Sequence, residues 1–292
     1  MSRHTTLRVG GPARYFFVGK SVEEVARAVA EARTKSVSYG IVGGGSNILL
    51  ADRGFDGLII KMGTRNISFV DQSHSSAYGT VVRAEAGVFS VALARAVAAQ
   101  SLAGIEWMVT LPGTVGGAVY GNAGAFGSET KDCLASVEYL DQAGELQIML
   151  RDACEFDYRN SIFKKQKPRL VVVAATFALK KGDASAIKTS MTTFLAKRKD
   201  EQPLGASSAG CMFKNHIEKD GTRVSAGYLI EKSGLKGFHV GAARVSDRHA
   251  NFCLNTGGAT AADVKTLAER VSDRVFSLHG IHLEPEVQFL GF

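Results

Sequence analysis

The sequence predicts an α/β fold of about two domains, and three observations support this prediction. The chain has 292 residues, and a globular domain commonly has roughly 100–200. Strand-like and helix-like segments alternate over the first third, as in a small α/β unit. From Thr80 onward the strand-like segments indicate a mixed sheet. Hydrophobic residues make up 45% of the chain and charged residues 22%, so a sizeable core is expected.

The first helix has a clear start signal. Residues 21–34 place apolar side chains at helical spacing. Ser21 is a suitable N-cap and Glu24 follows three residues later, which predicts a capping box. The strands expected around this helix cover residues 13–18, 38–42 and 58–61.

The rest of the chain is expected to continue with strands and helices of ordinary length. Residues 184–199 are predicted to form a helix that leads into a last unit. Further helices are expected at 89–100, 226–232 and 261–278, strands at 81–86, 137–140, 146–150, 170–179 and 250–254, and an extended end at 283–290.

The charge pattern argues against a nucleic-acid partner. The net charge is +7, but the densest basic run, residues 197–199, is followed at once by Asp200 and Glu201. Nucleic-acid binding normally needs a basic stripe or run. A scattered positive field fits a small polyanionic substrate instead.

The cysteines and the apolar segments predict a cytoplasmic protein with no membrane partner. Cys133, Cys154, Cys211 and Cys253 have no pairing or metal-ligand spacing, so free thiols and no metal site are expected. The first eleven residues lack the apolar stretch of a signal peptide. Residues 170–179 are too few to span a bilayer and indicate a buried strand.

Two glycine-rich clusters are the strongest functional signal. The first is Gly43, Gly44, Gly45, Ser46 and Asn47, directly after a predicted strand. Adjacent glycines allow the backbone to turn its N–H groups toward a ligand, typically a pyrophosphate. Neither the Rossmann fingerprint nor the P-loop pattern occurs here. A flexible surface turn is the alternative interpretation.

The second cluster lies within residues 112–127, where nearly every residue is small. Small residues permit close backbone approach, and two such clusters favour a long ligand lying across both. Tight helix packing is the alternative. The candidate contacts are Gly113, Thr114, Gly116, Gly117, Gly121, Asn122, Ala123 and Gly124.

Further motifs occur in one order along the chain, at residues 5–13, 158–164, 208–215, 226–231, 234–237, 249–252 and 284–287. Together with both glycine clusters they resemble the UDP-N-acetylenolpyruvoylglucosamine reductase family. The matches cover nearly the whole chain, and they are specific as a set although each is weak alone. The resemblance is to the shorter type, because no segment between Lys180 and Arg198 is long enough for an extra tyrosine-bearing loop.

The resemblance implies both a fold and a reaction. The fold would be α+β / α/β, with a two-subdomain FAD-binding module of the vanillyl-alcohol-oxidase/p-cresol-methylhydroxylase type at 1–182. Its subdomains would cover about 1–65 and 66–182, and residues 183–292 would form a C-terminal α+β substrate-binding domain. The cofactors would be FAD and NADPH. A monomer would reduce UDP-N-acetylglucosamine enolpyruvate to UDP-N-acetylmuramate for peptidoglycan synthesis. The alternative is another FAD-dependent oxidoreductase of the same cofactor fold, acting on an alcohol or sugar.

Three catalytic roles follow from the resemblance. Arg159 would stabilise the enolate that forms on the substrate carboxylate, because a guanidinium offers a rigid fork of donors. Glu286 would share that charge, which it can do only when protonated, and Glu284 is its nearest rival. Cys211 stands where the family usually has serine, and it would donate the proton because a thiol is the stronger acid. Ser207 and Ser208 are the alternative donors. By position, the resemblance assigns substrate binding to Asn215, Lys236, His249 and Arg198.

Overall fold

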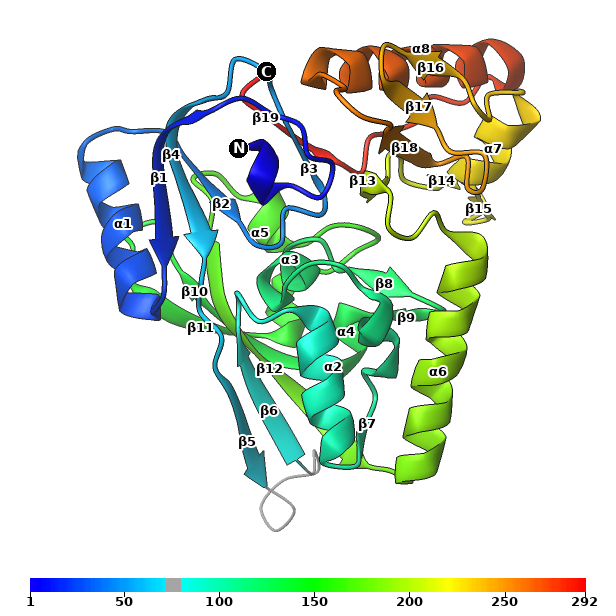
Figure 1. Ribbon diagram of the computed structural model, residues 1–292. Helices are drawn as coiled ribbons and strands as arrows, with labels where there is room; N and C mark the ends of the chain where they lie inside the picture. The colour runs from blue at the N-terminus through cyan, green and yellow to red at the C-terminus, as the bar shows by residue number, and fades with distance from the viewer. Residues whose placement is uncertain (72–79) are drawn as a thin grey trace. The chain divides into compact units, whose positions relative to one another are not determined.

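A computed structural model describes residues 1–71 and 80–292 (Figure 1). The chain forms two compact units, each assembled from separate stretches. One contains Met1–Arg14, Gly45–Gly57 and Lys199–Phe292, and the other contains Tyr15–Gly44 and Leu58–Arg198. The division predicted at residues 182/183 separates cofactor binding from substrate binding, and it stays a prediction.

The unit containing Tyr15–Gly44 is built on a sheet in which β12 is central, and the prediction of a mixed sheet is wrong here because all the strand pairs in its described part are antiparallel. The strand order of this sheet is β11-β10-β12-β6-β5, and β7 pairs with the C-terminal end of β12. The first five residues of β12 are buried, as expected for its continuous apolar run. The bounds are β5 Ile67–Asp71, β6 Thr80–Glu85, β7 Leu102–Ala103, β10 Leu134–Leu140, β11 Leu146–Leu150 and β12 Val171–Lys181.

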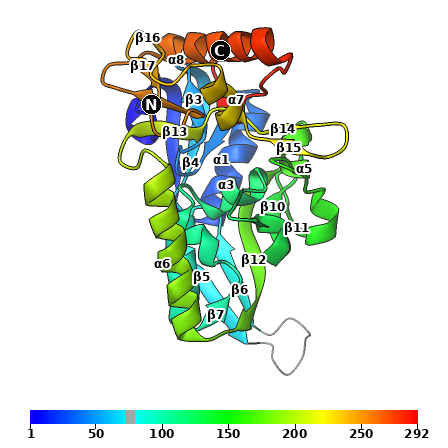
Figure 2. The same cartoon turned by 90° about the vertical axis from the view of Figure 1, so that its right-hand side faces the viewer.

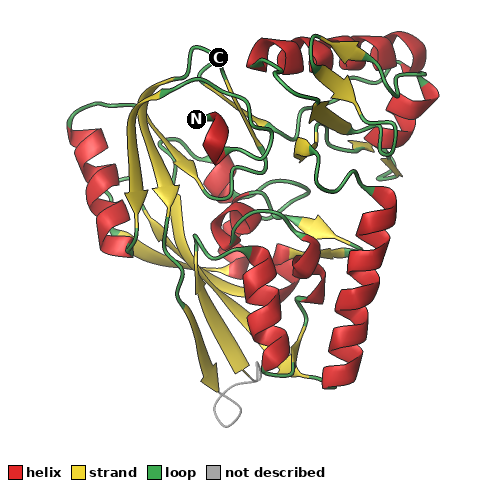
Figure 3. Ribbon diagram, in the orientation of Figure 1, coloured by secondary structure: helices red, strands yellow, loops and turns green. Residues whose placement is uncertain are grey.

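Helices cover this sheet and complete its core (Figure 3). Leu93 and Val97 of α2 lie in one apolar cluster with Trp107, Met108 and Phe177. Short hydrogen-bonded segments connect the helices. The bounds are α2 Ser90–Ala99, η2 Glu106–Thr110, α3 Val115–Tyr120, β8 Gly124–Ala125, β9 Ser128–Glu129, α4 Thr130–Cys133, η3 Arg151–Cys154, α5 Ile162–Lys165 and α6 Ala184–Glu201.

A smaller sheet of order β1-β4-β2 carries the first glycine cluster at the end of β2. Helix α1 begins after Ser21, whose hydroxyl accepts from Glu24 N at 3.2 Å. The predicted capping box is wrong in its second half, because Glu24 Oε2 accepts from Lys20 N and not from Ser21 N. The bounds are β1 Ala13–Gly19, α1 Val22–Thr34, β2 Tyr39–Val42 and β4 Phe55–Met62.

The unit that contains the C-terminus has a sheet of order β13-β18-β17-β16 packed against α8 (Figure 2). Val264, Leu267 and Val271 of α8 are buried in the apolar cluster of this unit. The parallel pair β3 and β19 joins the segment after the first glycine cluster to the chain end. The bounds are η1 Ser2–His4, β3 Ile48–Leu50, β13 Ser207–Cys211, β14 His216–Ile217, β15 Arg223–Val224, α7 Ala226–Lys232, β16 His239–Val240, β17 Ala243–Val245, β18 Phe252–Asn255, α8 Ala261–His279 and β19 Gln288–Leu290.

The predicted helices agree with the structure to within about two residues at each end. The expected extended end at 283–290 forms a strand only over β19, and β3 and β5 had no counterpart in the prediction. Within residues 1–71 and 80–292, no helix has the length and apolar character needed to cross a membrane.

Asp52, from a distant part of the chain, accepts hydrogen bonds from backbone N–H groups at the start of α8. Its Oδ1 accepts from Ala261 N at 2.8 Å and its Oδ2 accepts from Ala262 N at 2.9 Å. Thr260 and Asp263 form a capping box at the same end. Most N–H groups of the first turn therefore have a partner, and the segment holding Asp52 is fixed to α8.

We expect Asp52→Ala to lower the free energy of unfolding by about 1–2 kcal/mol, because two backbone donors lose a carboxylate at a helix N-terminus. Urea denaturation followed by circular dichroism measures this. Asp273→Ala, on an exposed part of the same helix, is the control and should change stability by less than about 0.5 kcal/mol. Equal effects of both substitutions would contradict the assignment.

Candidate functional site

The two glycine clusters meet within one compact unit. A Cβ added to Gly43 would lie 2.2 Å from Thr114 Oγ1, and one added to Gly44 would lie 2.9 Å from Gly113 Cα. Both distances are shorter than any ordinary contact, so glycine is required at both positions by packing alone. The prediction of a surface turn is therefore excluded for Gly43 and Gly44.

The second cluster is held along the segment that follows β6. Ser90 N donates to Gly113 O at 3.1 Å, and Val115 N donates to Val88 O at 2.8 Å. A Cβ on Gly116 would lie 2.8 Å from the Cβ of Ala86. Packing therefore explains the glycine at 116 as well.

Gly117 and Gly121 are different, because no packing within the protein requires glycine there. Gly117 lies in α3 and Gly121 directly follows it, and neither has a positive φ. Among the described residues, the atom nearest to an added Cβ is Thr114 Oγ1 at 3.8 Å for Gly117 and Gly117 O at 3.7 Å for Gly121. A helical glycine costs about 1 kcal/mol relative to alanine. Both distances are ordinary van der Waals contacts, so the protein itself would accept a side-chain carbon at either position.

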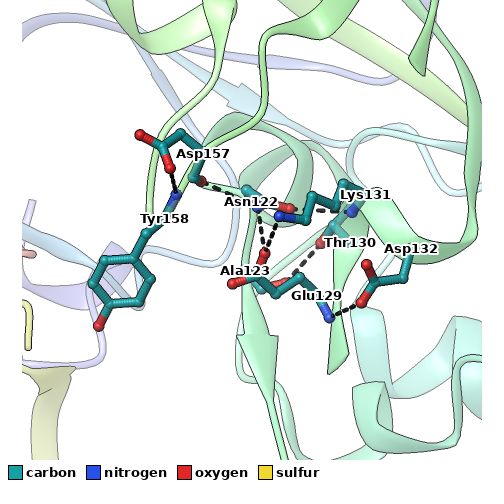
Figure 4. Close-up of polar contacts among 8 residues, drawn as sticks. All are labelled: Asn122, Ala123, Glu129, Thr130, Lys131, Asp132, Asp157 and Tyr158. Carbon is teal, nitrogen blue, oxygen red and sulfur yellow. Dashed lines mark hydrogen bonds and ion pairs between the residues drawn. The ribbon is translucent and has the colours of Figure 1, made fainter. Parts of the chain in front are cut away.

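Asn122 organises the end of the second cluster (Figure 4). Its side chain is fully buried, and Nδ2 donates to Glu129 Oε2 at 2.9 Å and to Asp157 O at 3.1 Å. Its Oδ1 accepts from Lys131 N at 3.1 Å. Next to it, Ala123 O accepts from both the backbone and the hydroxyl of Thr130. The amide of Asn122 thus binds protein groups on three sides.

Arg159 lies at the second glycine cluster, on a tight turn anchored by Asn122. Asp157 and Asn160 exchange backbone hydrogen bonds across this turn, and Arg159 adopts a left-handed φ of 54°. Its Nη2 donates to Gly124 O at 3.2 Å, and its guanidinium carbon lies 5.4 Å from the centre of the Tyr158 ring. A strained backbone at a charged side chain is typical of functional sites.

The remaining residues of the first cluster belong to the unit with the C-terminus. A Cβ on Gly45 would lie 2.1 Å from His4 O, so the N-terminal segment packs on this glycine. Asn47 Nδ2 donates to Glu286 O at 3.2 Å, and Asn47 O accepts from Gln288 N at 2.9 Å. Ser46, which lies between Gly45 and Asn47 in the chain, is half-buried. The cluster therefore also fixes the segment that bears Glu286 and leads into β19.

Cys211 and Glu286 lie on neighbouring segments. Cys211 ends β13, and the carbonyl of the next residue, Met212, accepts from Glu286 N at 2.8 Å. Both side chains are half-buried. Glu284, in contrast, forms an ion pair with Lys214 and has a 70% exposed side chain. The structure thus separates the two glutamates, although a regular strand would have placed them on one face.

Asn251 is a residue whose importance the sequence did not reveal. It is buried, its Nδ2 donates to Phe213 O at 2.8 Å and its Oδ1 accepts from Phe213 N at 2.9 Å. Its own carbonyl accepts from Met212 N at 2.7 Å. These three bonds hold the backbone just after Cys211. A lone asparagine in the 249–252 motif gave no sign of this, because its partners lie far away in sequence.

Three of the predicted substrate-binding residues gather around α7. Asn215 Oδ1 accepts from Ala226 N, at the start of the helix, at 3.1 Å. Lys236 Nζ pairs with Glu231, near the end of the helix, at 2.8 Å. The ring of His249 lies against the first turn of the helix, with Cε1 3.2 Å from the position of a Cβ on Gly227. Arg198, the fourth, lies on α6 in the other compact unit.

His249 has a partly buried ring whose Nδ1 accepts from Asn251 N at 3.3 Å. The ring also makes an edge contact with Phe252, with centroids 4.9 Å apart. Burial lowers the pKa of the His249 imidazole below its usual value. The neutral ring is therefore the form that this site favours.

Comparison with known proteins gives consistent matches along the chain. A model described as "FAD binding domain" matches residues 13–149, and one described as "UDP-N-acetylenolpyruvoylglucosamine reductase, C-terminal domain" matches residues 202–290. The UDP-N-acetylenolpyruvoylglucosamine reductase of Lachnoclostridium phytofermentans is 39% identical over 291 residues, covering 100% of this chain and 91% of that protein. The one from Carboxydothermus hydrogenoformans is 40% identical, covering 100% and 92%.

A solved structure agrees with these matches. The crystal structure of UDP-N-acetylenolpyruvylglucosamine reductase from Thermus caldophilus has a TM-score of 0.80 and 32% identity, covering 99% of this chain and 96% of that chain. The predicted fold, an FAD-binding module followed by a family-specific C-terminal domain, is confirmed.

The lowered pKa of His249 predicts a pH dependence of stability. The unfolded state binds a proton at higher pH than the folded state does, so this contribution to stability is present above the ordinary histidine pKa, about 6.5, and is lost as the pH falls below it. We expect His249→Gln to reduce the loss of unfolding free energy between about pH 7.5 and 5.5. His239→Gln, at an exposed position, is the control. An unchanged pH slope in the His249 variant would contradict this prediction.

Proposed function

This chain belongs to the UDP-N-acetylenolpyruvoylglucosamine reductase family, and from that premise we propose that it reduces the enolpyruvyl ether of UDP-N-acetylglucosamine enolpyruvate to UDP-N-acetylmuramate. The observation that carries the proposal is similarity over the full chain, from the FAD-binding module to the family-specific C-terminal domain. Bound FAD would supply the redox chemistry, taking electrons from NADPH and passing them to the enolpyruvyl double bond.

The two glycine clusters are our candidates for holding FAD. No protein atom clashes with a Cβ at Gly117 or Gly121, so we assign the absence of side chains there to close approach of a large planar or polyphosphate group. Gly43, Gly44, Gly113 and Thr114 would present their backbone where the two clusters meet. Ser46 is our candidate for a side-chain donor to FAD. We assign a shaping role to the others, whose packing and hydrogen bonds fix the loops, namely Gly45, Asn47, Gly116, Asn122, Ala123 and Gly124.

Arg159 is our candidate for stabilising the negative charge that develops on the substrate carboxylate. The strained turn and the bond to Gly124 O restrict the guanidinium, so little reorganisation is needed when the charge forms. Fixed charge in a partly desolvated site is commonly the largest contribution to catalysis. Lysine at this position would keep the charge but lose the forked geometry.

Cys211 is our candidate for the proton donor, and Glu286 for the group that shares the enolate charge. The S–H proton would pass to the carbon next to the ether oxygen, and solvent would then restore the thiol. Backbone bonds to Met212 O and Asn47 Nδ2 fix Glu286 on both sides of its Cα. Arg159 belongs to one compact unit and this pair to the other, so each role is argued within its own unit.

The residues around α7 are our candidates for binding the nucleotide-sugar. Lys236 would exchange its ion pair with Glu231 for a phosphate, which an ammonium binds as a point charge. Asn215 and His249 would complete the surface, and Arg198, which lies in the other unit, stays a candidate by its position in the sequence alone. We further propose a monomer that operates in the cytoplasm, where NADPH is available and where the buried free thiols of Cys133, Cys154 and Cys253 would stay reduced.

We expect Cys211→Ala to separate the two halves of the reaction. NADPH should still bleach the flavin absorbance near 450 nm at about the wild-type rate, because the thiol has no role in that step. Reoxidation on adding the UDP-enolpyruvyl sugar anaerobically should slow by about 10²–10⁴-fold, the usual contribution of general acid catalysis. Stopped-flow absorbance measures both steps.

Cys253→Ala is the matched control, because its buried thiol lies on the neighbouring strand β18. Cys211→Ser should restore reoxidation at least in part. Wild-type reoxidation in Cys211→Ala would exclude Cys211 as the donor and return Ser207 and Ser208 as candidates.

A further inference from the structure

Lys61 places an ammonium group beside the first glycine cluster. It lies on β4 and pairs in register with Val42, the residue just before Gly43. Its Nζ donates to Gly43 O at 3.4 Å, and its side chain is only partly exposed. A carbonyl carries a partial charge, so this long bond neutralises little of the full charge of Lys61.

Arg65 places a second cation beside the other cluster. Its Nη1 donates to the carbonyls of Met62, Thr64 and Gly87, the last at a very short distance. Its guanidinium carbon lies 5.0 Å from the centre of the Phe89 ring, and Phe89 bridges to Thr114 of the second cluster. The two cations therefore lie at the junction of the clusters.

These two cations have no carboxylate partner within residues 1–71 and 80–292. Burial lowers the pKa of the Lys61 ammonium, and the charge of Arg65 lowers it further. Burial also lowers the pKa of Arg65. The protein thus keeps a half-buried Lys61 and an exposed Arg65, two mutually repelling cations, where its own hydrogen-bond acceptors are carbonyl oxygens. An anion bound here would offset both the burial of the positive charge and the repulsion between the two cations.

We propose that Lys61, supported by Arg65, binds the diphosphate of the dinucleotide cofactor at the junction of the two glycine clusters. Backbone N–H groups can orient phosphate oxygens but carry no net charge, and an ammonium supplies that charge. A neutral part of the cofactor would not compensate the two cations. The inference rests on the proposed function only in taking the dinucleotide to be FAD. The diphosphate of NADPH has the same chemistry, and the experiment distinguishes the two sources.

The test compares Lys61→Gln with the wild type, using the full-length chain freed of flavin. Glutamine can still donate to Gly43 O, so the variant removes the charge while keeping the hydrogen bond. We expect the Kd for FAD and for ADP to rise at least tenfold, and the Kd for riboflavin, which has no phosphate, to stay within about twofold. Flavin fluorescence and calorimetry measure these constants. The salt dependence of FAD binding should also become weaker.

Two further variants test whether the effect comes from the positive charge at residue 61. Lys61→Arg keeps the charge and should stay within about threefold of the wild type for FAD. Lys188→Met, at an exposed position on α6, should leave all three constants unchanged. Lys61→Gln could fail to fold without ligand, and Lys61→Arg then carries the test. A Lys61→Arg protein that binds riboflavin but not FAD would contradict the proposal, because its positive charge is kept.

Other outcomes decide against the inference in distinguishable ways. Equal loss of FAD and riboflavin binding in Lys61→Gln would show that Lys61 only supports the loop. An unchanged Kd for FAD with a raised Kd for NADPH in the FAD-loaded variant would assign the lysine to the second dinucleotide. Wild-type protein that binds neither FAD nor ADP would overturn the proposed function as well.

Discussion

The close approach of Gly43–Gly44 to Gly113–Thr114 is the constraint on which the rest of the site depends. The distance between these backbones leaves no room for a side chain on either glycine. Segments about seventy residues apart are thereby joined, and the loop after β2 is fixed against the start of α3. Two further candidates for the cofactor lie in the same unit near this junction, namely the start of α3 with Gly117 and the cation at Lys61, whose Nζ donates to Gly43 O.

Each compact unit holds its candidate catalytic side chains with a buried amide. Asn122 binds Asp157 O and so anchors the turn that carries Arg159. Asn251 binds both backbone groups of Phe213 and so fixes the segment after Cys211, whose next carbonyl in turn binds Glu286 N. An amide side chain suits this task, because it donates and accepts at once and leaves no buried backbone group unpaired. Rigid support of this kind lets a site stabilise developing charge without rearranging.

Much of the fold could be predicted from the sequence because its elements are locally specified. Ser21 starts α1, and the apolar run of residues 170–179 became the central strand β12. What could not be predicted depends on distant partners. Asp52 caps α8 from more than two hundred residues away, and no local pattern marks it. For the same reason the two compact units, assembled from separate stretches, were not visible in the chain order.

In the candidate site, too, features marked by local sequence could be predicted, and features that depend on distant residues could not. The glycine clusters stood out by composition, but composition could not show that Gly43 is needed for packing and Gly117 is not. Likewise, strand alternation could not distinguish Glu284 from Glu286, which only the resemblance did, and the structure adds that Glu284 is exposed and paired with Lys214. Lys61 was overlooked because a single lysine on a strand has no sequence signature, and only its position beside Gly43 O made it conspicuous.

The most direct test of this account is the affinity of Gly117→Ala for FAD, measured together with its free energy of unfolding in the absence of flavin. The account predicts a chain as stable as the wild type, or more stable by up to about 1 kcal/mol, because alanine favours a helix and its Cβ would make only an ordinary contact, with Thr114 Oγ1 at 3.8 Å. It also predicts a Kd for FAD raised at least tenfold, about 1.4 kcal/mol. A Gly117→Ala protein that folds equally well and binds FAD with wild-type affinity would contradict it.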